Sequence, residues 1–335
     1  MYWDDTILTE GRRVGVIGTG STGVQLVCAL ADGAGHLIHF ARSPQWIMPG
    51  RQVAFTEEER KRFRESVAAI DAIRYGEQYQ SYLKMYYTAV VEPESPEYKF
   101  FERAVIQNLE ERVTDSQLRE KLRPNYRPMC KRLVMSWSYY DAIQKPNVHF
   151  ETNSIARIEP TGVRTADGTL HELDVIVLAT GFKVDQFIRP TIVRGRGGVQ
   201  LDDVWRVRPM AYQAISVPDF PNLFFLNGPS APVGNFSLIE VAELQWAYIA
   251  QLLQKIEDGD CTHISAKPLA LEEFEERRIA AAKRTIFASG CTSWYLDSEG
   301  IPGGWPWSFF VFVEAMRTPI FEHYDMRVRA CATGH

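Results

Sequence analysis

Six residues carry the plainest chemical pattern in this sequence, because three of them are glycines at fixed spacing: Gly18-Thr19-Gly20-Ser21-Thr22-Gly23. In a turn that follows a strand and opens a helix, the first glycine permits a tight bend and the second lets backbone approach a pyrophosphate. The third lets helix and strand pack closely, and the N–H groups at the helix start favour an anion. The spacing predicts a dinucleotide-binding turn. A glycine-rich turn without a ligand is the alternative.

Arg42 and Ser43 bear on which dinucleotide would bind there, since they end the next apolar run. An Asp or Glu at the end of the second strand would accept hydrogen bonds from the ribose 2′-hydroxyl of NADH. Arg42 instead offers a guanidinium that can form two hydrogen bonds with a 2′-phosphate, and Ser43 adds a hydroxyl. The pair favours NADPH over NADH, unless Arg42 is an ordinary solvated arginine.

Apolar patterning predicts the elements that must position these residues. Val14 to Ile17 indicate a strand, Val24 to Ala31 a helix, and Leu37 to Ala41 a second strand. Much later, Asp174 to Ala179 form an almost uninterrupted apolar run, which is typical of a central parallel strand. These runs predict an α/β protein with a Rossmann-like nucleotide-binding domain.

The region after the second strand has a helical pattern. Thr56 and Glu59 stand at the spacing of a capping box, and Phe63, Val67 and Ile70 fall on one face of a single amphipathic helix. Other runs predict further elements: a helix opened by Pro96, a helix from Asp115 to Pro124, strands at Val148 to Glu151 and Gly162 to Thr165, an Asp167-Gly168 turn, and a long helix from about Leu238 to Ile256. We therefore expect a helical insertion at about residues 56–125.

Composition and charge argue against several classes of protein. The 335 residues carry 37 Lys and Arg against 42 Asp and Glu, mixed along the chain, so the net charge of −5 gives no basic surface for nucleic acid. The 5 cysteines lack metal-ligand spacing and suit a reducing compartment. His36 and His39, three residues apart in a strand, point to opposite faces, so a metal site is not expected. Because neither a signal peptide nor a membrane-length apolar run is found, we expect a cytoplasmic protein.

Longer segments resemble one known family. "GRRVGVIGTGSTGVQ" and "FARSPQWIMPG" are similar to the second, NADPH-binding glycine motif of Baeyer-Villiger monooxygenases, and "WDDT" looks like the tail of that family's fingerprint, with Trp3 as its last aromatic residue. Three later segments follow in the family's order: "YRPMCKRLVMSWSYYDAI", "LDVIVLATGF" and "FPNLFFLNGPSAPVGNFSLIEVAELQ". A further matching segment, "SWYLDSEGIPGGWPWSF", lies near the end of the chain. The resemblance spans essentially the whole chain.

The resemblance implies roles for residues outside the glycine turn. Lys131 would pair with the 2′-phosphate alongside Arg42. Arg132 would be the catalytic arginine that stabilises the flavin peroxide, because a permanent charge in a water-poor pocket stabilises an anion. Outside this segment a Lys-Arg pair would be taken for a solvated loop. Thr180 and Gly181 match the family's Ala-Thr-Gly motif, where a small residue lets backbone approach a cofactor, although a glycine that simply ends a strand is the alternative.

Two further cofactor contacts are implied by the matched segments. Gln25 closes the first segment and is counted with the glycine turn as cofactor-binding. Asn235 precedes a predicted helix whose N-terminal amides would face the flavin, and an ordinary loop and cap is an equally good interpretation.

The implied architecture is an NADPH-binding domain at residues 1–182, which contains the helical insertion, followed by the C-terminal part of an FAD-binding domain at residues 183–335. The implied reaction uses NADPH, FAD and O2 to convert a ketone-like small molecule into an ester or lactone. Oxygenation of nitrogen or sulfur by the related flavin-containing monooxygenases is one alternative. An NADPH-binding module without catalysis of its own is another.

Members of the family begin with a separate glycine-rich unit that holds FAD, whereas this sequence contains a single motif of that kind. We therefore expect the chain alone to bind NADPH but to bind FAD weakly, as a truncated or split form. A half-domain exposes apolar surface, so we expect a separately encoded FAD-binding segment or a second copy of the chain as partner, and neither nucleic acid nor membrane.

Overall fold

The computed structural model describes residues 4–50, 53–184, 186–234 and 237–328. It divides into two compact units, one formed by residues 1–60 and 100–182 and the other by residues 61–99 and 183–335. Residues 61–99, within the expected insertion, therefore group with the C-terminal residues. The domain limits expected from the sequence stay a prediction.

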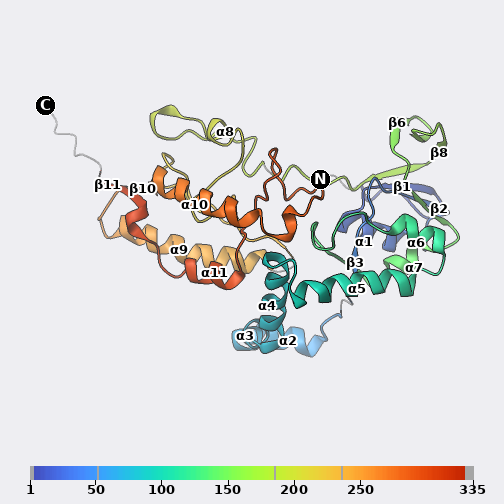
Figure 1. Cartoon of the computed structure of the whole chain (residues 1–335), viewed down its shortest axis with the longest axis horizontal. Helices are drawn as coiled ribbons and strands as arrows, with labels where there is room; N and C mark the ends of the chain where they lie inside the picture. The colour runs from blue at the N-terminus through green and yellow to red at the C-terminus, as the bar shows by residue number, and fades with distance from the viewer. Residues whose placement is uncertain (1–3, 51–52, 185, 235–236, 329–335) are drawn as a thin grey trace. The chain divides into compact units, whose positions relative to one another are not determined.

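A four-stranded parallel sheet organises the first unit (Figure 1). Its order is β5 (Val148–Glu151), β2 (His36–Phe40), β1 (Arg13–Ile17) and β9 (Val175–Leu178), and every neighbouring pair is parallel. The helix α1 (Ser21–Leu30) connects β1 to β2. This βαβ unit confirms the predicted α/β, Rossmann-like fold, because parallel strands need such a crossover.

The apolar run at Asp174 to Ala179 is a parallel strand, but the expectation that it is central was wrong. Among the strands of the described residues, β9 pairs with β1 alone and so lies at the edge of the sheet. Its Leu178 is 65% exposed. The apolar pattern records which faces a strand can bury and does not record how many strands flank it.

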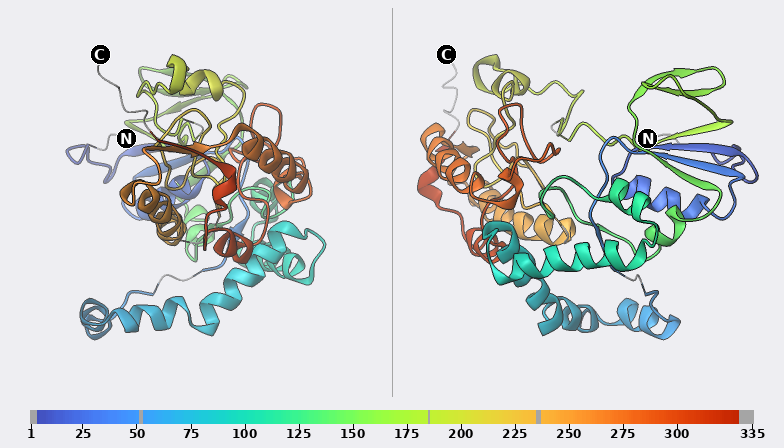
Figure 2. Two further views of the ribbon diagram at one scale, coloured as in Figure 1. Left: turned by 90° about the vertical axis from the view of Figure 1, so that its left-hand side faces the viewer. Right: turned by 45° about the vertical axis from the view of Figure 1, so that its right-hand side comes forward.

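Smaller sheets complete the first unit. A short parallel pair joins β3 (Ile47–Met48) to β4 (Val134–Met135), and an antiparallel meander contains β6 (Ile155–Glu159), β7 (Gly162–Thr165) and β8 (Leu170–Glu172). The right-hand view of Figure 2 shows this meander, in green, beside the blue parallel strands. The meander confirms the strand and turn predicted at residues 162–168, since Gly168 has a φ of +89° that favours glycine.

The insertion is helical, as the sequence predicts. Its helices are α2 (Glu57–Glu65), α3 (Val67–Arg74), α4 (Glu77–Val91), α5 (Pro96–Arg112) and α6 (Ser116–Leu122), and α7 (Tyr139–Ile143) follows it. The capping box at the start of α2 is confirmed, because the Thr56 N–H donates to Glu59 Oε2 at 2.8 Å and the Glu59 N–H donates to Thr56 Oγ1 at 3.2 Å. Pro96 opens α5, and the Asp115 carboxylate caps α6.

The single amphipathic helix expected from Thr56 onward is instead two helices. Ser66 ends the first and caps the second, since its hydroxyl oxygen accepts from the Ala69 N–H at 3.3 Å. Val67 is 74% exposed and Ile70 is 46% exposed, so the apolar face counted across the break is not buried. Serine favours the cap over the helix interior, because its hydroxyl competes for backbone N–H groups.

The second unit is built mainly from helices. After α3 and α4 it contains η1 (Arg196–Gly198), α8 (Leu201–Val204), α9 (Leu238–Glu257), β10 (His263–Ala266), α10 (Pro268–Ala282), η2 (Ile286–Ala288), α11 (Phe309–Ala315), η3 (Phe321–His323) and β11 (Tyr324–Arg327). The long helix predicted from Leu238 is confirmed as α9. None of the helices in the described ranges combines the length and apolar character needed to cross a bilayer.

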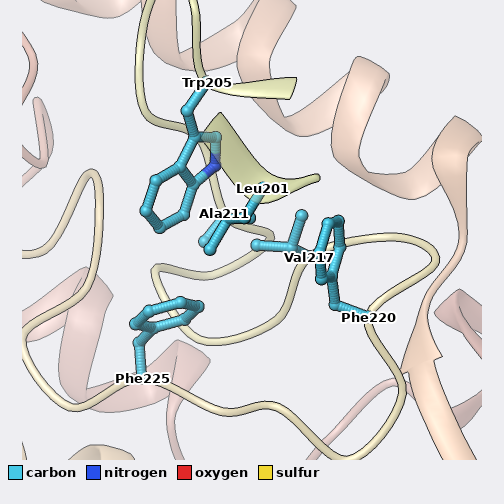
Figure 3. Close-up of a cluster of buried hydrophobic side chains, with 6 residues drawn as sticks. All are labelled: Leu201, Trp205, Ala211, Val217, Phe220 and Phe225. Carbon is cyan, nitrogen blue, oxygen red and sulfur yellow. The ribbon is translucent and has the colours of Figure 1, made fainter. Parts of the chain in front are cut away.

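Aromatic packing and one buried ion pair stabilise this second unit. Figure 3 shows Trp205 and Phe225 converging on Leu201 and Ala211, and the Trp205 and Phe225 ring centroids lie 5.4 Å apart. On α10, the buried Arg278 guanidinium forms two hydrogen bonds of 2.8 Å with the Glu275 carboxylate. Pairing of this kind is what makes burial of two charges tolerable.

Candidate functional site

The first glycine of the predicted turn is required by close packing. Gly18 has a φ of +117°, and a Cβ atom built on it would lie 2.3 Å from the Ala179 carbonyl oxygen. Its N–H donates to the Phe40 carbonyl oxygen at 3.2 Å, next to the end of β2. The turn after β1 therefore packs between the carboxyl ends of β2 and β9.

The other two glycines differ from each other. A Cβ atom on Gly23 would lie 1.9 Å from the Gly18 carbonyl oxygen, so α1 packs directly on the turn. A Cβ atom on Gly20 would have no heavy atom within 4 Å. Gly20 also caps α1 without any side-chain hydrogen bond. The open position is thus the one expected to face a pyrophosphate, beside the first N–H groups of a helix.

The flanks of the turn meet the segment after β2. The Thr19 hydroxyl donates to the Ser43 carbonyl oxygen at 2.8 Å, and the Lys131 ammonium donates to Ser43 Oγ at 3.3 Å. Lys131 also lies over the Tyr126 ring, with Nζ 4.2 Å from its centroid. The structure therefore brings Thr19, Ser43 and Lys131 together, although 88 residues separate the last two.

Arg42 and Lys131 lie near each other. Burial lowers the pKa of the Lys131 ammonium, and the positive charge of Arg42 lowers that pKa further. Among the residues that the structure describes, neither cation forms an ion pair with an Asp or Glu. Two cations held together without a carboxylate create a local field that attracts an anion.

A cavity of about 350 Å³ lies beside these residues. Its lining residues are Ala41, Arg42, Ser43, Pro44, Lys121, Arg123, Asn125 and Thr152. The Arg123 guanidinium is paired with Glu110 at 3.3 Å, whereas Lys121 has no carboxylate partner in the described part of the chain. The cavity is therefore cationic and polar, with no acidic residue in its lining.

Sequence reasoning missed four residues at this site. Thr152 follows β5 directly, and the rule that ligands bind at the carboxyl ends of parallel strands would have singled it out. Lys121 and Asn125 come from α6 and the loop after it, and no sequence signal placed them here. His39 was weighed only as a metal ligand, whereas its Nε2 lies 2.9 Å from the Gly18 carbonyl oxygen.

Several other predicted residues are exposed. Gln25 lies on α1, Arg132 lies in the loop before β4, and Thr180 and Gly181 follow β9. Thr180 adjoins the glycine turn, because its backbone nitrogen would lie 3.4 Å from a Cβ atom built on Gly18. Gly181 has a φ of +91°, which favours glycine. Trp3 and Asn235 lie outside the described residues. The contacts expected of all these residues stay predictions.

Comparisons with known proteins extend over most of the chain. It is 40% identical over 326 residues to an uncharacterized monooxygenase of Mycobacterium tuberculosis. This alignment covers 97% of this chain and 65% of that protein. It is 32% identical over 295 residues to a Baeyer-Villiger monooxygenase of Pseudomonas aeruginosa, covering 88% of this chain and 55% of that protein. The chain thus spans only part of each relative. No family model matches it.

Solved structures agree with the fold. The cyclohexanone monooxygenase of Rhodococcus sp. Phi1, bound to NADP+, matches with a TM-score of 0.79 and 25% identity over 98% of this chain and 69% of that chain. Other matching structures contain FAD together with NADP.

Substitution of Gly18 and of Gly20 should have unequal effects on thermal stability. We expect Gly18→Ala to lower the thermal unfolding temperature strongly, because the new Cβ meets the Ala179 carbonyl and the φ of +117° is strained. Gly20→Ala should unfold near the wild-type temperature, since the added methyl meets no atom. Differential scanning calorimetry of both variants provides the measurement, and equal losses of stability would contradict this description of the turn.

The buried His39 should make the protein sensitive to acid. Burial lowers the pKa of its imidazole from 6.5 to about 4. The unfolded chain therefore takes up the proton first, so this contribution to stability is complete above pH 6.5 and is lost as the pH falls toward 4. The full loss is roughly 3 kcal/mol at 1.36 kcal/mol per pKa unit.

His39→Leu removes this titration and serves as the control. Denaturant unfolding between pH 7 and pH 4.5 should show the stability difference between wild type and variant shrinking in acid. A difference that stays constant over this range would rule out His39 as the titrating group.

Proposed function

We propose, on the premise that this chain is homologous to the flavin-dependent monooxygenases of the Baeyer-Villiger type, that it supplies the NADPH-binding and C-terminal parts of such an enzyme. The observation that carries the proposal is the pair of cations, Arg42 and Lys131, without carboxylate partners in the described residues beside an open glycine turn. Because the chain spans 65% and 55% of two relatives, the activity of the whole protein is part of the proposal.

The residues present fit NADPH. Backbone at Gly20 and the first turn of α1 would hold the pyrophosphate, since Gly20 is open and the helix start favours an anion. Arg42, Ser43 and Lys131 would hold the 2′-phosphate, which NADH lacks. The absence of an acidic residue from the cavity lining favours a cofactor with the additional negative charge.

The loop that carries Lys131 would also serve the reaction. Arg132 follows directly and its side chain is exposed, whereas Lys131 is half-buried and donates to Ser43 Oγ. One residue can therefore hold the nucleotide while the next holds negative charge that develops on an oxygen atom. When bound, FAD would supply the oxygen chemistry by which a ketone, O2, NADPH and a proton give an ester or lactone, NADP+ and water.

FAD requires a pyrophosphate cradle of its own. In this proposal the turn from Gly18 to Gly23 serves NADPH, and the sequence contains no second glycine motif of this form. Thr180 and Gly181 could contact a flavin from one side. The adenine and diphosphate would then be held by residues outside these 335.

The 2′-phosphate assignment predicts selective losses of affinity. Arg42→Ala and Lys131→Ala should each weaken NADPH binding about 10-fold to 100-fold, because a hydrogen bond to a charged group contributes roughly 1.5–3 kcal/mol. NADH binding should change little. Isothermal titration with both nucleotides provides the measurement, and Arg12→Ala, an exposed cation just before the amino end of β1, is the matched control. Equal losses for the two nucleotides would overturn the assignment.

The cofactor division predicts a protein that lacks tightly held flavin. The purified 335-residue chain should bind NADPH but show less than stoichiometric flavin absorbance in its visible spectrum. Addition of a polypeptide that carries the family's FAD-binding unit should restore flavin binding and NADPH oxidation. Stoichiometric FAD on the chain alone would mean that the glycine turn serves the other cofactor.

The restored complex also decides the substrate class. Ester or lactone formed from ketones supports the Baeyer-Villiger reaction. Oxidation of amines or sulfides with ketones left unchanged would favour the heteroatom-oxygenating alternative.

A further inference from the structure

We propose that His39 is a positioning residue for the dinucleotide site, because its imidazole connects the carbonyl group of the glycine turn to the helix that follows the Lys131 loop. The inference rests on the proposed NADPH function. It assigns to a residue on β2 a role that neither the glycine motif nor the cation pair describes.

Two short hydrogen bonds define the connection. His39 Nε2 lies 2.9 Å from the Gly18 carbonyl oxygen, and His39 Nδ1 lies 3.0 Å from the Tyr139 hydroxyl. The histidine side chain is fully buried, with an exposed fraction of 0%. A carbonyl oxygen only accepts hydrogen bonds, so Nε2 carries the hydrogen, and Nδ1 must accept from the Tyr139 hydroxyl. The geometry therefore fixes one tautomer and one direction of donation.

The surroundings of His39 keep it neutral. Tyr139 on α7 presents a hydroxyl, Phe150 on β5 presents a ring whose centroid lies 5.6 Å from that of the imidazole, and the turn presents the Gly18 carbonyl. The groups that face it from these elements carry no charge at neutral pH, since burial holds the pKa of the Tyr139 hydroxyl well above its ordinary value. A neutral imidazole can donate at one nitrogen and accept at the other.

The orientation of the Gly18 carbonyl affects the position of the first turn of α1. A Cβ atom on Gly23 would lie 1.9 Å from this oxygen, so the carbonyl sits against the first turn of α1. A rotation of the Gly18 peptide would displace that turn, and with it the N–H groups proposed to face the pyrophosphate. The hydrogen bond from His39 opposes the rotation.

The other end of the connection reaches the cation loop. Tyr139 begins α7, and its N–H donates to Ser136 Oγ at 3.2 Å. Ser136 Oγ also lies 3.8 Å from Cys28 Sγ on α1. Ser136 is in the segment that leads from Lys131 through β4. His39 thus contributes to holding the proposed pyrophosphate cradle and the proposed 2′-phosphate contacts in one arrangement.

This role predicts a pattern of affinity unlike that of the cations. NADPH and NADH share the pyrophosphate, so loss of the Gly18 contact should weaken both nucleotides by the same factor. Loss of Arg42 or Lys131 should weaken NADPH alone.

The experiment compares His39→Leu with His39→Gln by titration with NADPH and NADH. The glutamine amide extends about as far as Nε2 and retains a donor for Gly18, whereas leucine has none. Thermal unfolding of each variant shows that it is folded at the temperature of the titration. His39→Leu should bind each nucleotide roughly 3-fold to 10-fold more weakly than His39→Gln, as expected for one neutral hydrogen bond of about 0.5–1.5 kcal/mol.

Four outcomes distinguish the possibilities. Equal nucleotide affinity in the two variants, or a loss confined to NADPH, would overturn the role of His39. Failure of the wild-type chain to bind either nucleotide would overturn the proposed function and this inference with it. Equal binding of NADPH and NADH by wild type, with both weakened in His39→Leu, would support His39 and contradict the 2′-phosphate assignment.

A measurement on the unmodified protein covers the case in which the variants do not fold. Nitrogen-15 NMR of the His39 imidazole at neutral pH should show the hydrogen on Nε2. A hydrogen on Nδ1 would leave Gly18 without its donor and would contradict the proposal.

Discussion

The close approach of backbone at Gly18 is the constraint on which the candidate site depends. This residue meets the Ala179 carbonyl on one side, and its own carbonyl meets Gly23 on the other. Side chains at either glycine would separate β9 or α1 from the turn. The carboxyl ends of β1, β2 and β9 are thereby brought to one edge of the sheet, which is where parallel α/β proteins bind their ligands.

Electrostatics at this edge work against stability and in favour of binding. Burial lowers the pKa of the Lys131 ammonium, and repulsion between Arg42 and Lys131 lowers that pKa further. A protein selected only for stability would place a carboxylate between them. The two cations lie beside a polar cavity without a carboxylate, so an anionic ligand can pair with them. Strained or unpaired groups have the same role at many functional sites.

The sequence predicted elements whose signals are local. Strands β1, β2 and β5, the capping box at Thr56 and the helix from Asp115 each depend on residues a few positions apart, and all were found. The wrong predictions have two causes: two local signals competed, or the outcome depended on residues far away in the sequence. Ser66 broke an apolar periodicity that had suggested one helix, and β9 took an edge position that its composition does not encode. His39 and Lys121 acquire their surroundings only when distant segments meet, so the sequence offered no way to place them.

Neither unit is a continuous stretch of chain, because residues 61–99 belong to the unit that also contains residues 183–335. During synthesis β1 is therefore made long before its partner β9, and the Asp174 carboxylate that accepts from the Arg13 N–H is 161 residues away. Such separation raises contact order and slows folding. It also means that truncation at one point cannot isolate either unit whole, because each unit is interrupted by a segment of the other.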